Sequence, residues 1–282
     1  MEKIHPVTQA LINRKGLKVP IQDGKKITLV LFGGLMVGAR GAGSLVALQE
    51  LGLTNSFDEI YTMSSGFVNA SGFLSGQAQT VASVYYDKLS GLKFLNPFRI
   101  WQIADLKYLF KIIKENLIDF KKILEKRTKL YTMLIDVSKN EKSEYLEVHN
   151  FAESEYFNII KASCSLRFIA GGNVQIGNNY YRDILNNQAI YDFFAHILDS
   201  NATDILVVYN YSWQKEFIHK KFPKLNNKRV YEFYPEFNEK LLKFFPKFAR
   251  FDTRQDILKS QCQIFGDETK KIFGSAEPIK LL

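Results

Sequence analysis

The sequence is poor in cysteine and has no long hydrophobic run. Only two cysteines, Cys164 and Cys262, occur among 282 residues; this excludes a disulfide framework and a cysteine-rich zinc module, and it suits a reducing compartment. No stretch approaches the roughly 18 uncharged apolar residues of a membrane-spanning helix, and residues 1–20 lack the apolar core of a secretory signal. We therefore expect a cytoplasmic protein without a membrane span.

Internal repeats and low-complexity tracts are also absent from the sequence. Hydrophobic residues make up 46% and charged residues 24% of the chain, which excludes a disordered or fibrous protein. The net charge of +9, from 38 Lys+Arg against 29 Asp+Glu, fits a solvated lysine-rich surface, but it also fits contact with nucleic acid or an anionic membrane. Since no nucleic-acid recognition motif accompanies the charge, we expect no nucleic-acid partner.

Short apolar runs alternate with helical patterns along the chain. Residues 27–32 (ITLVLF) and 59–63 (EIYTM) are each followed by a glycine- or serine-bearing turn and then by a helical pattern. Three later runs, at 130–137, 204–210 and 229–234, have the composition of further strands. This alternation predicts an α/β fold with a mainly parallel sheet.

No shift in composition divides the chain after its polar beginning. We therefore predict a lead-in segment over residues 1–25 and a single domain over residues 26–282. Leucine and phenylalanine at helical spacing predict one long amphipathic helix over residues 105–127. We expect its apolar side to pack on the core, and the alternative is contact with lipid headgroups.

Two turns between a predicted strand and a predicted helix are candidates for chemistry. The turn at 33–41 (GGLMVGARG) would expose backbone N–H groups at a helix N-terminus, where they hold phosphate or an oxyanion. It is not a Walker A loop, because no Gly-Lys-Ser/Thr follows. The turn at 62–67 (TMSSGF) places Ser64 where a serine nucleophile sits, two residues before Gly66. Taken alone, the glycines of the first turn could serve only to let the strand and the helix pack closely. The serine of the second turn could be an ordinary helix N-cap.

The two turns, in this order, resemble motifs of the patatin-like phospholipase family. Residues 38–41 (GARG) match the end of the family's G-G-G-x-R/K-G turn, and residues 57–70 (FDEIYTMSSGFVNA) match its G-x-S-x-G elbow and the following helix. Residues 160–166 (IKASCSL) resemble its R-A-S-x-A-x-P segment, and residues 178–190 (NNYYRDILNNQAI) its Y-x-D-G-G-x-x-x-N-x-P-I segment. The resemblance covers roughly residues 26–210 and extends, more loosely, through residues 229–235, as in a bacterial branch of the family.

Each catalytic motif also departs from the family pattern. The glycines at 33–34 lie upstream of the matched GARG, as if residues were inserted, and Thr62 stands in place of the first elbow glycine. In the third motif Asp183 lacks the following glycine. Counting without gaps places Tyr181 on the family's aspartate position, so Asp183 takes that role only if two residues have been lost from the turn.

The resemblance implies a patatin-like three-layer sandwich, with a mainly parallel sheet and helices on both faces. It further implies a lipid acyl hydrolase of the phospholipase A or esterase type that needs no metal and no other cofactor. In that mechanism an aspartate deprotonates a serine that attacks the ester, and backbone N–H groups stabilise the oxyanion. The expected residues are the catalytic Ser64 and Asp183, the oxyanion turn Gly38, Ala39, Arg40 and Gly41, and the elbow residue Gly66.

The alternative reading is a catalytically degraded patatin-fold protein that binds lipid or a protein partner without turnover. The expected partner of the active enzyme is a lipid or phospholipid ester substrate. Residues 237–250 (FNEKLLKFFPKFAR) interleave phenylalanine with lysine, which is typical of an interfacial segment. We therefore also expect peripheral contact with an anionic membrane.

Overall fold

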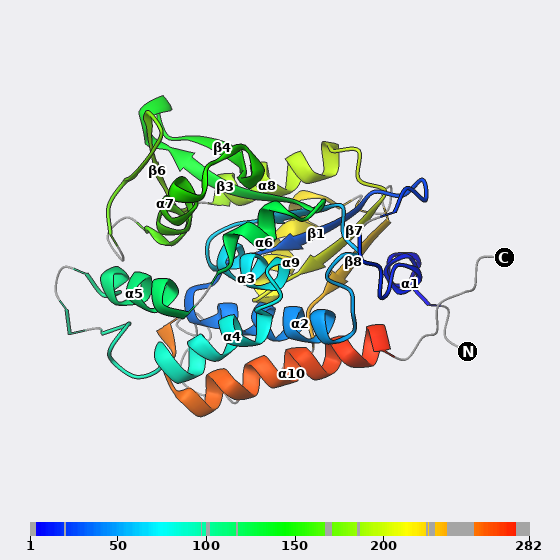
Figure 1. Cartoon of the computed structure of the whole chain (residues 1–282), viewed down its shortest axis with the longest axis horizontal. Helices are drawn as coiled ribbons and strands as arrows, with labels where there is room; N and C mark the ends of the chain where they lie inside the picture. The colour runs from blue at the N-terminus through cyan, green and yellow to red at the C-terminus, as the bar shows by residue number, and fades with distance from the viewer. Residues whose placement is uncertain are drawn as a thin grey trace.

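The computed structural model describes residues 4–19, 21–96, 98–99, 102–116, 118–166, 171–184, 187–223, 225, 229–235 and 251–274. Within these residues eight strands form a single sheet in the order β5-β6-β3-β2-β1-β7-β8, and β4 pairs with β3. Helices cover this sheet on both sides (Figure 1). The predicted α/β fold with a mostly parallel sheet is therefore confirmed.

The parallel part of the sheet consists of the five strands predicted from the sequence. They are β1 (Ile27–Leu31), β2 (Glu59–Thr62), β3 (Lys129–Asp136), β7 (Asp204–Val208) and β8 (Arg229–Phe233). Neighbours in the order β3-β2-β1-β7-β8 run parallel. Every residue of β1 and of β7 is buried, as the near-continuous apolar composition of both strands requires.

Three further strands were not predicted. They are β4 (Lys142–Glu147), β5 (Val174–Ile176) and β6 (Asn179–Arg182), and they pair antiparallel with β3 or with each other. Their sequences gave little signal, because β4 is largely half-exposed and polar and the other two are very short. Asp183 directly follows β6, so the pairing of these strands determines where its side chain lies.

Successive residues of β1 face the two helical layers in turn. Leu29 and Leu31 belong to the larger core cluster, whereas Val30 and Phe32 belong to the second cluster on the other face. The larger cluster packs under α2 (Gly38–Glu50), α3 (Ser65–Leu74), α4 (Ala78–Ser83), α7 (Glu153–Cys164) and α10 (Gln255–Gly274). The second lies under α8 (Asn187–Asp199) and α9 (Ser212–Lys221). The predicted three layers are present.

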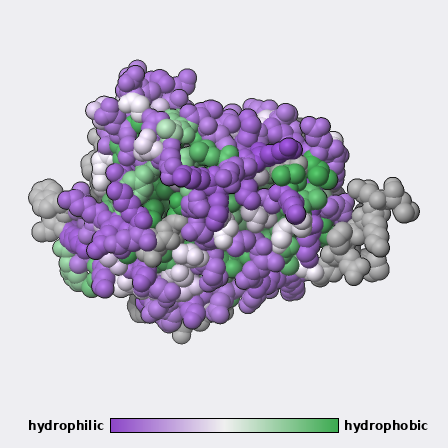
Figure 2. Space-filling view, viewed as in Figure 1, coloured by the Kyte–Doolittle hydropathy of each residue, from purple (hydrophilic) through white to green (hydrophobic). Residues whose placement is uncertain are grey.

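The face of the molecule seen in Figure 2 is largely polar. On the face drawn in Figure 2, hydrophilic residues cover most of the molecule and hydrophobic residues show as separate patches between them. No helix in the described ranges is long and apolar enough to cross a membrane. The predicted interfacial segment at 237–250 lies outside the described residues.

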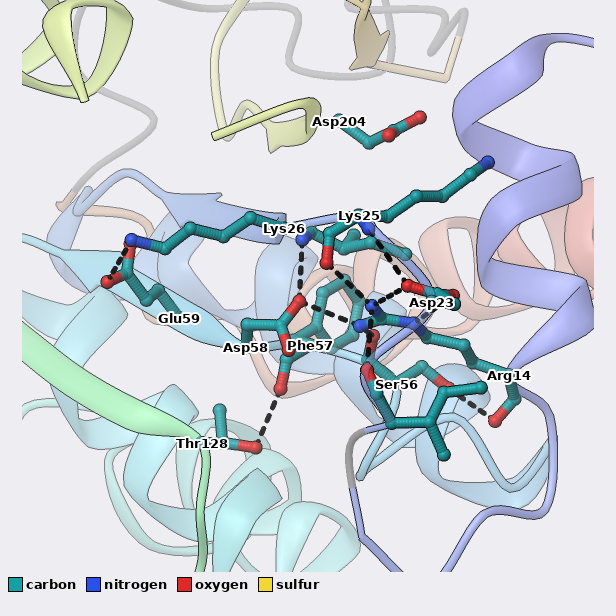
Figure 3. A network of polar contacts seen from close by, with 12 residues as sticks. Arg14, Asp23, Lys25, Lys26, Ser56, Phe57, Asp58, Glu59, Thr128 and Asp204 are labelled. Atoms are coloured by element: carbon teal, nitrogen blue, oxygen red, sulfur yellow. Dashed lines mark hydrogen bonds and ion pairs between the residues drawn. The ribbon is translucent and has the colours of Figure 1, made fainter. Parts of the chain in front are cut away.

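The beginning of the chain differs from the polar lead-in expected for residues 1–25. Helix α1 (Pro6–Asn13) buries Val7 and Leu11 in the larger core cluster. The fully buried Arg14 guanidinium then pairs with Asp23 and Asp58, each at 2.7 Å (Figure 3). This segment is therefore attached to the core. The sequence gave only a weak helical periodicity here, because a helix of eight residues makes little more than two turns.

The predicted single helix over residues 105–127 is wrong. The segment forms two helices, α5 (Leu106–Asn116) and α6 (Phe120–Leu124). The physical reason is Asp119, whose carboxylate accepts a hydrogen bond from the N–H of Lys122 at 3.3 Å and so starts a new helix. The expected packing of the apolar side is confirmed, since Leu109 and Ile113 are buried in the core.

Candidate active site

Two strand-to-helix turns meet at the carboxyl ends of β1 and β2, which are adjacent and parallel. The turn after β1 contains Gly33 and Gly34 and enters a short 3₁₀ helix, η1 (Leu35–Val37), before α2. The turn after β2 contains Met63 and Ser64 and enters α3. The apparent insertion between Gly34 and Gly38 in the sequence thus forms the 3₁₀ helix.

Ser64 has a strained backbone, with φ 53° and ψ −135°. A non-glycine residue in such a region costs on the order of 1–3 kcal/mol and is found mainly where function requires it. The serine is the N-cap residue of α3 by position, yet its side chain makes no capping hydrogen bond. The plain N-cap interpretation of Ser64 therefore fails.

Close packing on both sides of Ser64 explains two of the local glycines. A Cβ on Gly66 would lie 2.7 Å from the carbonyl oxygen of Leu31, so the helix can approach β1 only because position 66 is glycine. A Cβ on Gly33 would lie 2.3 Å from the Cβ of Ser64. Thr62, which replaces the first elbow glycine, is accommodated because its hydroxyl donates to the Tyr131 carbonyl at 2.7 Å.

Asp183 lies in the same cavity as Ser64 and is almost completely buried. Burial raises the pKa of its carboxyl group to about 7, and the Ser64 hydroxyl and the N–H of Ile184 act in the opposite direction. Oδ1 accepts the Ile184 N–H at 2.8 Å, whereas Oδ2 has no hydrogen bond of full geometry within the described residues. The Ser64 hydroxyl therefore lies close enough to act on the pKa of this carboxyl group without forming a hydrogen bond of full geometry.

Tyr181, which ungapped counting placed on the family's aspartate position, points elsewhere. Its hydroxyl donates to Glu144 at 3.2 Å, and it does not appear among the described residues that line the Ser64 cavity. Tyr181 pairs with Asp136 in the antiparallel part of the sheet. Of the two candidates in this motif, only Asp183 is brought to the serine.

The four predicted oxyanion residues, Gly38, Ala39, Arg40 and Gly41, open α2 and are buried. The N–H of Gly41 already donates to the Asn210 side chain at 3.0 Å, and the Arg40 side chain donates to the Asn210 carbonyl at 2.7 Å. The Gly41 N–H and the Arg40 side chain are thus bonded to Asn210, whereas Gly33 adjoins Ser64 directly. The sequence did contain a signal for the contact of Gly33 with Ser64, because Gly33 and Gly34 follow the apolar run at 27–32.

Leu35 and Ser64 are the two residues of the site with positive φ, at 52° and 53°. Both line two cavities. The N–H groups of Leu35 and Met36 begin η1, so that helix offers them no carbonyl acceptor. The N–H of Gly34, in contrast, donates to the Ser65 hydroxyl at 3.1 Å, which gives Ser65 a supporting role.

The cavity between Ser64 and Asp183 is strongly apolar. It is lined by side chains from α4, the following turn of π-helix η2 (Val84–Lys88), α5 and the end of α7. These include Val81, Val84, Tyr85, Leu89, Leu106, Leu109, Ile113 and Cys164. Burial, and next the charge of Asp183, raise the pKa of the Cys164 thiol to about 12, so this thiol stays neutral and is no rival nucleophile.

A second, more polar cavity lies at Ser64 as well. It is lined by the glycine turn and by Met63, Leu166, Ile184, Asn187, Ile190, Tyr211, Trp213 and Gln214. Ser64 thus lies where an apolar and a mixed cavity meet. No histidine lines either cavity among the described residues, and no cluster of three or more metal-ligating side chains is found there.

Fold and site together define a mixed α/β protein with a serine on a strand-to-helix turn and a carboxyl group in the same cavity. No protein-family model and no curated protein matches the chain by sequence. Solved structures with a similar fold include VipD from Legionella pneumophila, at 10% identity and a TM-score of 0.48 over 89% of this chain and 67% of VipD. Human GIVD cytosolic phospholipase A2, solved with methyl gamma-linolenyl fluorophosphonate and terbium chloride, matches at 11% identity and 0.48. That match covers 96% of this chain, which spans only 61% of the human one.

Proposed function

We propose that this protein is a serine lipid acyl hydrolase, of the phospholipase A or esterase type, with Ser64 as nucleophile and Asp183 as general base. The observation that carries the proposal is the placement of both residues in one apolar cavity, with Ser64 held in a strained conformation. A buried carboxyl group whose pKa is near 7 is suited to accept and return a proton at neutral pH.

The chemistry follows from these groups. The Asp183 carboxylate accepts the hydroxyl proton as the Ser64 oxygen attacks the ester carbonyl, forming a tetrahedral oxyanion. That intermediate collapses, the carbon–oxygen bond to the alcohol breaks, and the alcohol leaves with the proton from Asp183. Water then attacks the acyl-serine by the same route, releasing the fatty acid and restoring the serine.

For the oxyanion we propose the N–H groups at the start of η1, those of Leu35 and Met36. Both belong to the turn that adjoins Ser64, and neither has an acceptor within its own helix. One such donor is commonly worth about 3–4 kcal/mol of transition-state stabilisation. Gly41 is not part of this proposal, because its N–H is already bonded to Asn210.

The two cavities suit the two halves of an ester. The apolar cavity, lined by Val84, Leu109 and Ile113 among others, has the surface for an acyl chain. The mixed cavity, with Asn187 and Trp213, has the polar groups for the alcohol part. We therefore propose a lipid or phospholipid ester as substrate, in a cytoplasmic protein that contacts anionic membranes peripherally.

The decisive experiment combines covalent labelling with turnover. The wild-type chain is treated with a fluorophosphonate, the labelled peptide is identified by mass spectrometry, and hydrolysis of p-nitrophenyl esters is followed. We expect labelling at Ser64 and loss of hydrolysis in Ser64→Ala by about 1,000-fold or more, with an unchanged circular dichroism spectrum.

Ser65→Ala is the matched control on the neighbouring hydroxyl. Because Ser65 accepts the Gly34 N–H, we expect a partial loss, much milder than that of Ser64→Ala, and unchanged labelling of Ser64. A folded wild-type chain that is neither labelled nor active would overturn the proposal in favour of a protein that binds lipid or a partner without turnover.

A further inference from the structure

The carbonyl groups of the turn beside Ser64 are held by side chains from the segment that follows β7. Gln214 donates its Nε2 to the Gly33 carbonyl at 3.1 Å, and Asn210 donates its Nδ2 to the carbonyls of Phe32 and Gly33. The Tyr211 hydroxyl donates to the Gly34 carbonyl at 3.3 Å. Three neighbouring side chains thus bind three successive carbonyls.

These side chains are themselves fixed. Asn210 and Gln214 are 1% and 4% exposed, and the Gln214 side-chain oxygen accepts the N–H groups of Asn210 at 2.9 Å and Tyr211 at 3.1 Å. The Asn210 side-chain oxygen accepts the N–H of Gly41 at 3.0 Å. Asn210 therefore connects the beginning of the turn to the first turn of α2.

Holding a carbonyl also aims the next N–H. In a trans peptide the C=O and the following N–H lie in one plane and point in opposite directions. The contacts at Gly33 therefore set the direction of the Gly34 N–H, and the Tyr211 contact at Gly34 sets that of the Leu35 N–H. The latter is one of the donors assigned above to the oxyanion.

Glycine offers no resistance of its own to reorientation at these two positions, because it populates a wide range of backbone angles. The sequence after β1 has two glycines in a row, and the next residue, Leu35, has a strained positive φ of 52°. Within the turn the Val37 N–H donates to the Gly34 carbonyl at 3.2 Å, and the Gly34 N–H donates to Ser65. The three side chains above add the hydrogen bonds that hold the carbonyls of Phe32, Gly33 and Gly34 from outside it.

We propose that Asn210, Tyr211 and Gln214 are positioning residues: Asn210 and Gln214 fix the turn at Gly33, and Tyr211 fixes the Gly34 carbonyl, so that the N–H groups that follow face the oxyanion formed at Ser64. The proposal rests on the proposed hydrolase function. It assigns a role that these side chains perform through the turn; Asn210 lines neither cavity, whereas Tyr211 and Gln214 also line the mixed cavity.

The test uses substitutions that keep the acceptor atoms and remove only the donors to the turn. Gln214→Glu and Asn210→Asp each replace an amide nitrogen that faces the carbonyl by an oxygen. Tyr211→Phe removes only the hydroxyl, so it remains informative if a buried new carboxylate prevents folding. Asn55→Asp is the matched control, because its amide donates to the Leu17 carbonyl at 2.9 Å and it lines neither cavity at Ser64.

The concentration of active sites is titrated with the fluorophosphonate, and hydrolysis rates are expressed per active site. Hydrogen exchange is followed in the peptide that covers residues 33–37. We expect kcat to fall by about 10- to 100-fold in the three variants, with KM changed less than about threefold. Binding of a trifluoromethyl ketone, which forms an oxyanion on the serine, should weaken by the same factor as kcat/KM. Exchange at 33–37 should become faster.

Asn55→Asp should match the wild type in every one of these measurements. Unchanged kcat per site and unchanged exchange in all three variants would overturn the positioning role while the hydrolase function stood. If the wild type itself shows no turnover and no labelling, the hydrolase function and with it this catalytic role are overturned; the exchange data then still report whether these side chains hold the turn.

Discussion

Gly33 and Ser64 are packed so closely that a Cβ on the glycine would lie 2.3 Å from the serine Cβ and 2.9 Å from its hydroxyl oxygen. Neither residue is close to the other in sequence, and they are brought together because β1 and β2 are adjacent parallel strands. The serine can occupy its position only because residue 33 has no side chain.

We therefore expect Gly33→Ala to lower kcat/KM by at least about 100-fold and to destabilise the fold by about 1–3 kcal/mol through overpacking. Gly172→Ala is the control, since a Cβ there meets no atom within 4 Å. Ester hydrolysis and thermal unfolding measure the two effects. Wild-type rates in Gly33→Ala would show that the serine at this position is not the nucleophile.

Asp183 sets the expected pH dependence of activity. The mechanism requires the carboxylate, and burial raises the pKa of this group to about 7, so kcat/KM should rise with pH through a midpoint near 7. Asp183→Asn should lower kcat by about 100- to 10,000-fold and abolish that midpoint. Retention of the same midpoint in the variant would assign it to another group.

The same carboxyl group should also make stability depend on pH. Its pKa is about 7 in the folded protein, against an ordinary value of 3.8 for this side chain in water. The group's stabilising contribution is therefore complete below pH 4 and is lost as the pH rises to about 7. Each pH unit between the two pKa values is worth about 1.36 kcal/mol, so the loss is on the order of 4 kcal/mol.

Asp183→Asn removes this dependence because the amide does not ionise. We expect the variant to be more stable than the wild type at pH 8, with the difference shrinking toward pH 4. Urea unfolding at several pH values measures it. A constant difference between the two proteins across this range would contradict the raised pKa.

The apolar cavity predicts which acyl chains are accepted. Val84 is 7% exposed and lines this cavity beside Leu109, so Val84→Phe should shorten the space for the chain. We expect at least a tenfold loss of kcat/KM for p-nitrophenyl octanoate and less than a threefold loss for the acetate. Val19→Phe, at a residue 47% exposed, is the control. Equal losses on both esters would show that the acyl chain lies elsewhere.

Residues 237–250 predict binding to anionic bilayers. A variant with Gln in place of Lys240, Lys243 and Lys247 should bind vesicles containing anionic lipid more weakly, since each lysine near the surface contributes about 1 kcal/mol. Co-sedimentation measures this, and added salt should weaken binding of the wild type in the same way.

The control for charge alone replaces three lysines of α5 and α6 by Gln, namely Lys107, Lys111 and Lys121. It lowers the net charge by the same amount, and we expect it to bind nearly as well as the wild type. Equal binding of the wild type to anionic and neutral vesicles would contradict the membrane prediction.

The parallel part of the sheet could be predicted from the sequence because each of its strands contains a short run rich in apolar, β-branched or aromatic residues. Residues 27–32 needed no tertiary information to be recognised, since a strand buried on both faces has no polar alternation. The elbow at Ser64 was equally visible, because a serine and a glycine directly follow such a run. The spacing of apolar residues after each turn also predicted the helix that follows it.

Tertiary structure alone decided which groups meet. Strand β6 has four residues and little apolar signal, yet its pairing with β3 turns Tyr181 toward Glu144 and leaves Asp183 in the cavity of Ser64. Likewise Asn210 and Gln214, far along the chain, reach the glycine turn only because β7 pairs with β1. Sequence patterns report burial of a segment along the chain; contacts between distant segments depend on strand order and register, which those patterns do not contain.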